Sequence, residues 1–167
     1  MLYNPKSIAN YFLEIALRNG EKLRPMKLQK LVYYAHGWYS GYTGQPLISE
    51  PVEAWRHGPV IASIYHEFKS FGSGEITRKA TEFDGHLLCE VPAPVEPEIR
   101  QFLDNVWKSY GQFTGLKLSE MTHAVDSPWH RTWNAHPGMQ GVDIPFDQIK
   151  GHFRAAADAA SQRAQTA

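Results

Sequence analysis

The fold of this chain is decided by residues 24–39, RPMKLQKLVYYAHGWY, in a sequence of 167 residues. Apolar side chains recur here three and four positions apart, at Leu28, Leu31, Val32, Ala35, Trp38 and Tyr39. That spacing places them on one face of an α-helix. Pro25 suits the first helical position, where its missing N–H would be unpaired in any case. The sequence therefore predicts a helix with a buried face, ended by Gly41 and Gly44 before Pro46.

Helical spacing recurs on both sides of this stretch. Asn4-Pro5 is expected to begin a short helix that Asn19-Gly20 ends. The most regular helical period covers Ile99 to Tyr110, and Gly111 ends it. Further helices are expected after Gly58-Pro59 (with Val60, Ile61, Ile64, Tyr65 and Phe68 buried), after Thr114, after Ser127-Pro128, and from Asp147 onward.

Three stretches indicate extended structure. Residues 47–57 are expected to be extended, although Pro51 argues against an interior sheet position. Asp84-Gly85 is a hairpin signal before a strand at 87–91, and a short strand is expected at 142–144. The predicted fold is α+β, mainly α: a compact bundle of about six helices with a small β hairpin or short sheet.

The composition fits one domain, expected at residues 1–154, because 43% of the residues are hydrophobic. The alanine-rich residues 155–167 are expected to form a tail with a frayed end. The first residues lack the pattern of a secretory signal, and no apolar run reaches the roughly 18 residues of a membrane span. A cytoplasmic location is therefore expected.

Charge is balanced overall, with 17 basic and 17 acidic residues. That balance argues against general binding to nucleic acid. Residues 1–30 carry six basic side chains against two acidic ones, and residues 75–105 carry seven acidic against three basic ones. The two stretches either face each other or give the surface a sign that a partner recognises. Lys27 and Lys30 fall off the apolar helix face and are expected to point to solvent or to a partner.

The polar side chains form no recognisable catalytic or metal motif. His123, Asp126, His130 and His136 lie in one stretch but match no compact ligand spacing, so we expect neither a metal nor a cofactor. Cys89 is the single cysteine and lies in the apolar run HLLCEV, which favours a small core residue over a nucleophile. We therefore expect a protein that is not an enzyme.

Two alternatives to a simple binding protein stay open. The first is a DNA-binding regulator, in which the two helices joined by residues 20–24 would form a helix-turn-helix, although that connection is longer than usual. The second and weaker alternative is a hydrolytic enzyme using His123 and Asp126.

Two segments combine tryptophan and histidine with a proline-fixed backbone, at residues 55–60 (WRHGPV) and 122–129 (THAVDSPW). Each is expected at a helix boundary. They are interpreted either as buried corners, in which the indole and imidazole groups are hydrogen-bonded locally, or as the lining of a groove.

Three segments together resemble a known family. Residues 24–35 (RPMKLQKLVYYA) resemble its P-x-K-L-Q-K-L-x-Y-x-A helix, residues 53–60 (EAWRHGPV) its A-W-x-x-G-P-V block, and residues 118–129 its L-S-x-x-T-H-x-x-x-S-P-W block. The chain thus resembles the Panacea domain, also called the phage-associated GepA or SocA-like group, over roughly residues 5–153. The family-motif residues are Pro25, Leu28, Gln29, Leu31, Tyr34, Gly58, Pro59, Ser127 and Pro128.

The resemblance implies an antitoxin, encoded beside a toxin that it neutralises by direct protein–protein binding. One branch of the family, SocA, is also a proteolysis adaptor that delivers its toxin to the ClpXP protease. The expected partners are therefore a cognate toxin and the ClpXP protease, and the resemblance suggests a prophage-associated gene. The candidate partner-binding residues are Lys27, Lys30, Trp55, Arg56, His57, His123 and Trp129.

Overall fold

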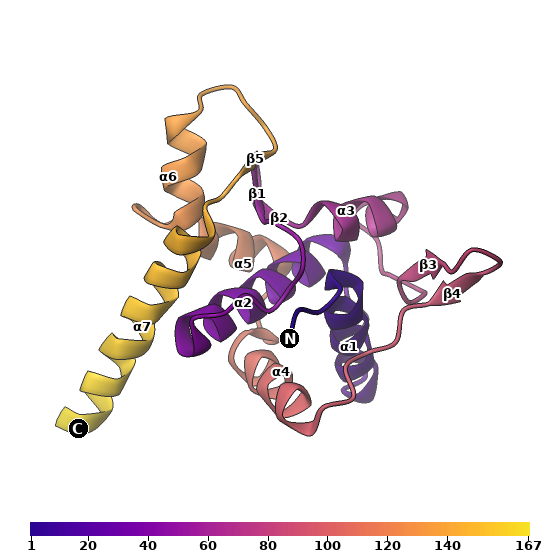
Figure 1. Ribbon diagram of the computed structural model, residues 1–167, viewed down its shortest axis with the longest axis horizontal. Coiled ribbons are helices and arrows are strands. Elements are labelled where there is room, and N and C mark those ends of the chain that lie inside the picture. The colour runs from indigo at the N-terminus through magenta and orange to yellow at the C-terminus, as the bar shows by residue number, and fades with distance from the viewer.

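A computed structural model describes all residues, 1–167, and shows an α+β fold that is mainly α, as expected (Figure 1). Seven α-helices and a 3-10 turn, Lys69–Phe71, follow one another along the chain. The helices are α1 Pro5–Arg18, α2 Pro25–Thr43, α3 Ala62–Phe68, α4 Pro97–Tyr110, α5 Gly115–Thr122, α6 Pro128–Ala135 and α7 Phe146–Thr166.

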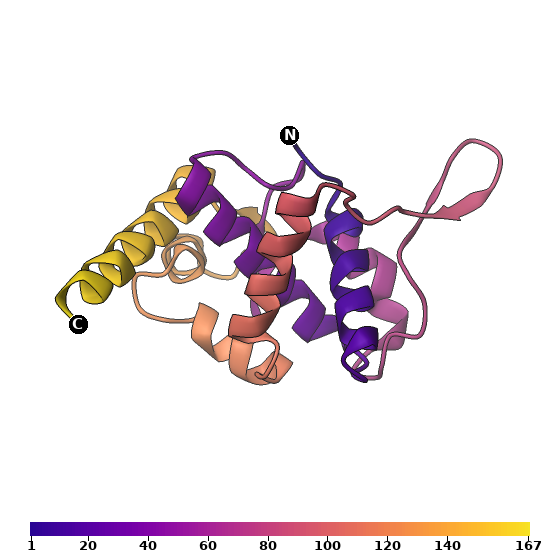
Figure 2. The same cartoon turned by 90° about the horizontal axis from the view of Figure 1, so that it is seen from below.

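The helix predicted from residues 24–39 is the central element of the fold. α2 contacts α1, α3, α4, α5 and α7, which surround it (Figures 1 and 2). On its predicted apolar face Leu28, Leu31, Val32 and Ala35 are buried, and Trp38 and Tyr39 are partly buried. Residues on the other faces, including Tyr33 and Tyr34, are buried as well. In a helix that is covered on all sides, each side chain must either be apolar or find hydrogen-bond partners for its polar groups inside the protein.

Capping side chains confirm several predicted helix starts. Asn4 accepts a hydrogen bond from the backbone N–H of Lys6, Thr114 from that of Lys117, and Ser127 from that of His130. Each bond satisfies a backbone donor that has no partner within the helix. At the other end of α2, Gly44 adopts the left-handed conformation at φ 76° and ends the helix.

Two small antiparallel sheets complete the fold. β1 Glu53–Trp55 lies between β2 Gly58–Val60 and β5 Val142–Asp143, with Ala54 paired to Pro59 and Val142. β3 Thr81–Phe83 and β4 Leu88–Glu90 form the predicted hairpin, which projects from the helical body (Figures 1 and 2). The third helix begins later than expected, at Ala62, because Val60 pairs with Glu53 as part of a strand.

Several expectations about exposure are wrong. Lys27 and Lys30 are buried, at 9% and 2% exposure, rather than facing solvent. Cys89 is exposed on β4 instead of buried in the core, because no other element covers the hairpin. Gly41 does not end α2 but lies inside it, where a Cβ atom would meet the backbone of Phe153.

The alanine-rich residues 155–167 continue α7 as far as Thr166. Ile149 and Phe153 in the first half of α7 are buried. The second half extends past the rest of the molecule (Figures 1 and 2). None of the helices is both long and apolar enough to cross a membrane.

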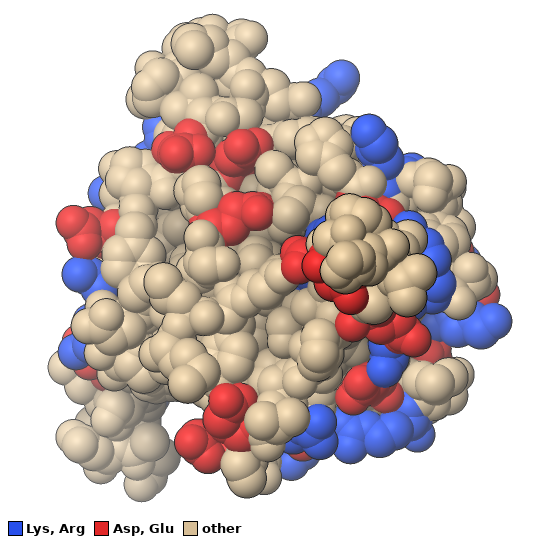
Figure 3. All heavy atoms as spheres, turned by 45° about the vertical axis from the view of Figure 1, so that its right-hand side comes forward, with Lys and Arg blue, Asp and Glu red and all other residues tan.

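The basic and acidic stretches do meet in part. Arg18 pairs with Asp104 at 3.5 Å, and Lys22 pairs with Glu75 at 3.9 Å. Figure 3 shows acidic and basic side chains intermixed along one side of the molecule, with a broad area beside them that carries neither. Both charge pairs are well exposed, so they add little to stability.

Candidate partner-binding site

The three motif segments, distant in sequence, meet in one corner of the molecule, which we call the motif corner (residues 24–35, 53–60 and 118–129). Gln29 on α2 links the first two segments through a reciprocal pair of bonds with Ile61. Its amide donates to the Ile61 carbonyl at 2.9 Å and accepts from the Ile61 N–H at 3.0 Å. Because Ile61 follows β2 directly, this pair fixes the β1–β2 hairpin against α2.

Lys30 lies beneath the turn of that hairpin. Its ammonium donates a hydrogen bond to the Pro59 carbonyl at 3.0 Å. Gly58, at φ 113°, is the residue of the turn whose backbone lies against Thr122 and Lys30. A Cβ atom there would lie 2.8 Å from the Thr122 hydroxyl and 3.0 Å from the Lys30 ammonium. Both the backbone conformation and the space therefore require glycine.

One hydroxyl group joins the third segment to the second, and two more make bonds within the third segment. Ser119 donates to the His57 carbonyl at 2.6 Å, Thr122 to the Ser119 carbonyl at 2.6 Å, and Ser127 to the Thr122 carbonyl at 2.8 Å. These serines and threonines are buried, so each bond satisfies a polar group that is removed from water.

Trp129 connects α6 to β1. Its indole N–H donates to the Trp55 carbonyl at 2.7 Å, and its ring stacks on His123 with centroids 3.9 Å apart and on Trp133 at 5.7 Å. Trp129 is 6% exposed. The expected buried corner is therefore the right description of this tryptophan, since its ring is already covered.

Histidine 123 is held in the same stack. Burial lowers the pKa of its imidazole, and the nearby Lys30 charge lowers that pKa further. Its Nε2 atom is buried without a hydrogen-bond partner. The neutral ring is therefore favoured at neutral pH.

The exposed part of the motif corner is a cavity of about 290 Å³ between the start of α2, the β1–β2 turn and α3. Trp55 and Tyr65 form one wall, with ring centroids 4.6 Å apart. Arg56 and His57 are exposed at its edge. The groove interpretation thus holds for residues 55–57, whereas residues 122–129 form the buried side of the corner.

The floor of this cavity includes Lys30. Burial lowers the pKa of its ammonium to about 7, because desolvation disfavours the charged form. No acidic side chain lies within ion-pair distance of it, although Lys6, Lys22, Lys27 and Lys79 elsewhere all have such a partner.

Lys27 lies apart from this cavity. Its ammonium donates to the Gly111 carbonyl at 2.6 Å and pairs with Glu21 at 2.5 Å. These contacts bind α2 to the end of α4. The structure therefore brings together Lys30, Trp55, Arg56 and His57 but places Lys27 in a structural role.

The family-motif residues mostly build the corner. Pro25 begins α2 and borders the cavity, and Tyr34 stacks on Tyr110 at 4.2 Å. The others are buried: Leu28, Gln29, Leu31, Gly58, Pro59, Ser127 and Pro128. The cavity also includes Met26, Tyr65 and Lys69, which the sequence does not single out as binding candidates. Of these, the sequence predicts only Tyr65 to matter, as a buried residue, and that prediction is wrong because Tyr65 is exposed.

The alternative chemistries lack a matching geometry. Asp126 is exposed and its backbone N–H donates to the His130 ring, while His123 stacks on Trp129, so the two do not form a hydrogen-bonded pair. No three His, Cys, Asp or Glu side chains gather closely enough to hold a metal ion. α2, which would be the recognition helix of a helix-turn-helix, is buried on all sides over residues 27–37.

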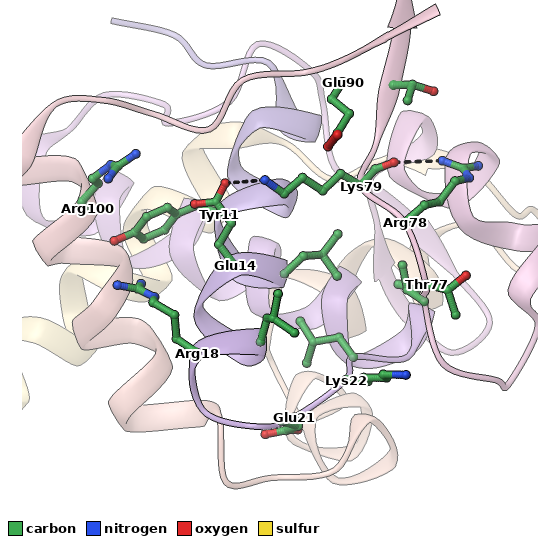
Figure 4. Close-up of a pocket in the computed structure, with 15 residues that line it drawn as sticks. Tyr11, Glu14, Arg18, Glu21, Lys22, Thr77, Arg78, Lys79, Glu90 and Arg100 are labelled. Atoms are coloured by element: carbon green, nitrogen blue, oxygen red, sulfur yellow. Dashed lines mark hydrogen bonds and ion pairs between the residues drawn. The ribbon is translucent and has the colours of Figure 1, made fainter.

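The largest cavity lies elsewhere, between α1, α4 and residues 76–81 (Figure 4). It has a volume of about 890 Å³ and mixed lining charges, with Lys79 paired to Glu14 at 2.7 Å and Arg18, Arg78 and Arg100 around it. Its lining carries five basic and three acidic side chains, but four of the five basic ones already have an acidic partner. Most of its positive charge is therefore not available to a ligand.

Fold and motif corner together place the chain in a defined class. The family described as "Antitoxin SocA-like, Panacea domain" matches residues 28–130, which include most of α2, the β1–β2 hairpin, α5 and the start of α6. The chain belongs to this family. It is 30% identical over 154 residues to Antitoxin SocA of Caulobacter vibrioides (strain NA1000 / CB15N), an alignment that covers 89% of this chain and 81% of that relative. No solved structure matches the chain.

Proposed function

We propose that this protein neutralises a cognate toxin by binding it directly through the exposed side of the motif corner. One observation carries the proposal: three family-motif segments, distant in sequence, meet in one corner, where the first two line an exposed cavity and the third supports it from the buried side. Family membership supplies the antitoxin role and implies the toxin partner. The proposed site of action is the cytoplasm, where a toxin made beside its antitoxin would first be met.

Within the motif corner, the residues that support the β1–β2 turn differ from those that are exposed to a partner. Gln29, Ser119 and Trp129 hold the β1–β2 turn in place from beneath. Arg56 and His57 are exposed on that turn and free to meet a partner. A rigid turn limits the conformational entropy lost on binding, which favours affinity.

Co-expression with the product of the adjacent gene tests this function. We expect the wild-type chain to restore growth and to co-purify with the toxin. A double Arg56→Ala, His57→Ala variant should weaken that complex, whereas Lys108→Ala, Lys117→Ala removes two exposed side chains on α4 and α5 and should not. A folded wild-type chain that neither rescues growth nor co-purifies with the toxin would contradict the proposal.

A role as a proteolysis adaptor for ClpXP is a finer part of the same proposal. It is supported by similarity to Antitoxin SocA and by the second half of α7, whose side chains are largely exposed beyond Phe153. Deletion of residues 155–167 separates the two activities. We expect toxin binding to be retained and ClpXP-dependent toxin degradation to be lost. Unchanged degradation would assign the adaptor surface elsewhere.

A further inference from the structure

The cavity of the motif corner is lined by cations without any acid. Lys30, Arg56, His57 and Lys69 line it, and no Asp or Glu does. None of the three Lys and Arg side chains has an acidic partner within ion-pair distance, in contrast to Lys79 and Arg78 beside the larger cavity. Glu53 on β1 is engaged instead by the Trp55 indole N–H at 2.7 Å. The cavity therefore has an unbalanced positive sign.

Lys30 makes the imbalance most pronounced. It is 2% exposed, and its ammonium has three N–H donors but one hydrogen-bond acceptor, the Pro59 carbonyl. Burial without a counter-ion lowers the pKa of this ammonium to about 7, and an arriving carboxylate would favour its charged form and pair with it. Such a group at the floor of a cavity is a recognition feature rather than a stabilising one.

The remaining walls restrict what the anion is attached to. Met26, Trp55, Ile64 and Tyr65 give the cavity an apolar lining. Its volume of about 290 Å³ lies at the lower end of the range for small-molecule sites, about 300–1,000 Å³. It therefore suits one or two side chains of a protein better than a cofactor or a nucleotide.

We infer that this cavity receives a carboxylate side chain of the partner, Asp or Glu, from a segment in which an apolar residue adjoins it. The carboxylate pairs with Lys30 and Arg56, and the apolar neighbour packs on Trp55 and Tyr65. This inference rests on the proposed function for the identity of the partner as a toxin, but the binding chemistry belongs to the cavity itself.

Two capped peptides provide a test that does not need the toxin. Acetyl-Gly-Glu-Leu-Glu-Gly-amide and its Gln-Leu-Gln counterpart differ only in the two carboxylates. We expect the acidic peptide to shift the backbone amide signals of Gly58 and His57 and the Trp55 indole signal of the ¹⁵N-labelled full chain in a saturable way, and the neutral peptide to bind at least about tenfold more weakly.

Variants locate the binding. Lys30→Met and the exposed pair Arg56→Gln, Lys69→Gln should each weaken acidic-peptide binding by at least about tenfold. Lys108→Gln, Lys117→Gln removes the same charge elsewhere and should leave the binding unchanged. If Lys30→Met fails to fold, the exposed pair still decides. Equal shifts with both peptides, no saturable shift, or unchanged binding in the exposed pair would overturn the inference.

Inorganic phosphate and the toxin complete the comparison. If phosphate shifts the same signals at the same concentration as the acidic peptide, the cavity is a general anion site and the inference fails. Peptide binding at the cavity without growth rescue keeps the inference and contradicts the antitoxin proposal. Growth rescue without peptide binding does the reverse.

Discussion

The indole N–H of Trp129 donates a hydrogen bond to the backbone carbonyl of Trp55 at 2.7 Å, across 74 positions of the sequence. The bond ties the start of α6 to the end of β1, just before the exposed Arg56 and His57. A buried aromatic side chain thus controls the placement of a turn whose own side chains face solvent. In the proposed interface, partner contact and structural support therefore fall to different residues.

The first prediction concerns this bond. Trp129→Phe keeps an aromatic ring but removes the donor, leaving the Trp55 carbonyl unpaired, and should lower the free energy of unfolding by about 1–3 kcal/mol. Trp133→Phe reduces the same aromatic stack but leaves the hydrogen bond to Trp55 intact, so it should lower the free energy of unfolding by less. Urea unfolding measures both variants. Equal losses would show that ring volume, and not the bond, matters at position 129.

A second prediction concerns the packing of α7 on α2. A Cβ atom at Gly37 would lie 2.2 Å from the Phe153 ring, so Gly37→Ala should displace the ring and destabilise the fold by about 1–3 kcal/mol. At Gly151, on α7, nothing lies within 4 Å. Gly151→Ala should therefore stabilise the helix by about 0.5–1 kcal/mol through propensity alone. Thermal unfolding compares the two, and a gain from Gly37→Ala would contradict the packing.

Acid sensitivity gives a third prediction, centred on His36. Burial lowers the pKa of this imidazole from 6.5 to about 4, and its Nδ1 accepts from the Leu47 N–H. Between those values the unfolded chain binds a proton that the folded chain does not, so stability falls as the pH drops through this window. The loss from His36 approaches about 3 kcal/mol.

The control for that prediction is His36→Gln, which keeps a side-chain acceptor but does not titrate. Burial also lowers the pKa of His123 and His152, so the wild type and the variant should both lose stability in acid. The wild type should lose more between pH 6.5 and pH 4. Urea unfolding at each pH gives the stability of both proteins. If the two stabilities fall in parallel with pH, His36 is not a source of the acid sensitivity.

The fourth prediction uses the exposed position of Cys89. Because the thiol lies on the uncovered β3–β4 hairpin, it should react fully with a chromogenic disulfide reagent in the native protein. Adding denaturant should raise that rate by less than about tenfold, since exposure already controls access. A native thiol that reacts only after unfolding would mean that the hairpin is covered.

Local signals predicted most of the secondary structure. Asn4, Thr114 and Ser127 cap helices as expected, because a cap is decided by residues within three positions of it. The two lysines of α2 were misplaced for the opposite reason. Helical periodicity assigns lysine to the polar surface. Lys30 is instead covered by the β1–β2 turn, whose Pro59 carbonyl accepts its hydrogen bond from 29 positions away, and no local sequence pattern contains that contact.

The candidate site was likewise predicted in part. The family resemblance pointed to Trp55, Arg56 and His57, which do lie at one cavity with Lys30. The helical period predicts Tyr65 as a buried residue, which is wrong because it is 39% exposed at the cavity. Lys69 carries no sequence signal, since its position depends on how α3 leaves β2. The apolar run around Cys89 predicts a core residue, which is wrong because an unaccompanied two-stranded hairpin buries neither of its faces.

The most extensive helix contact in the molecule joins two segments made at very different times. α2 is complete at Thr43, yet the partner that covers Gly37 and Gly41 is Phe153 on α7. At translation speeds of about 5–20 residues per second, that interval lasts on the order of ten seconds. Throughout it, Gly37 and Gly41 lack the side chain that covers them, so this part of the core closes only after Phe153 has been synthesised.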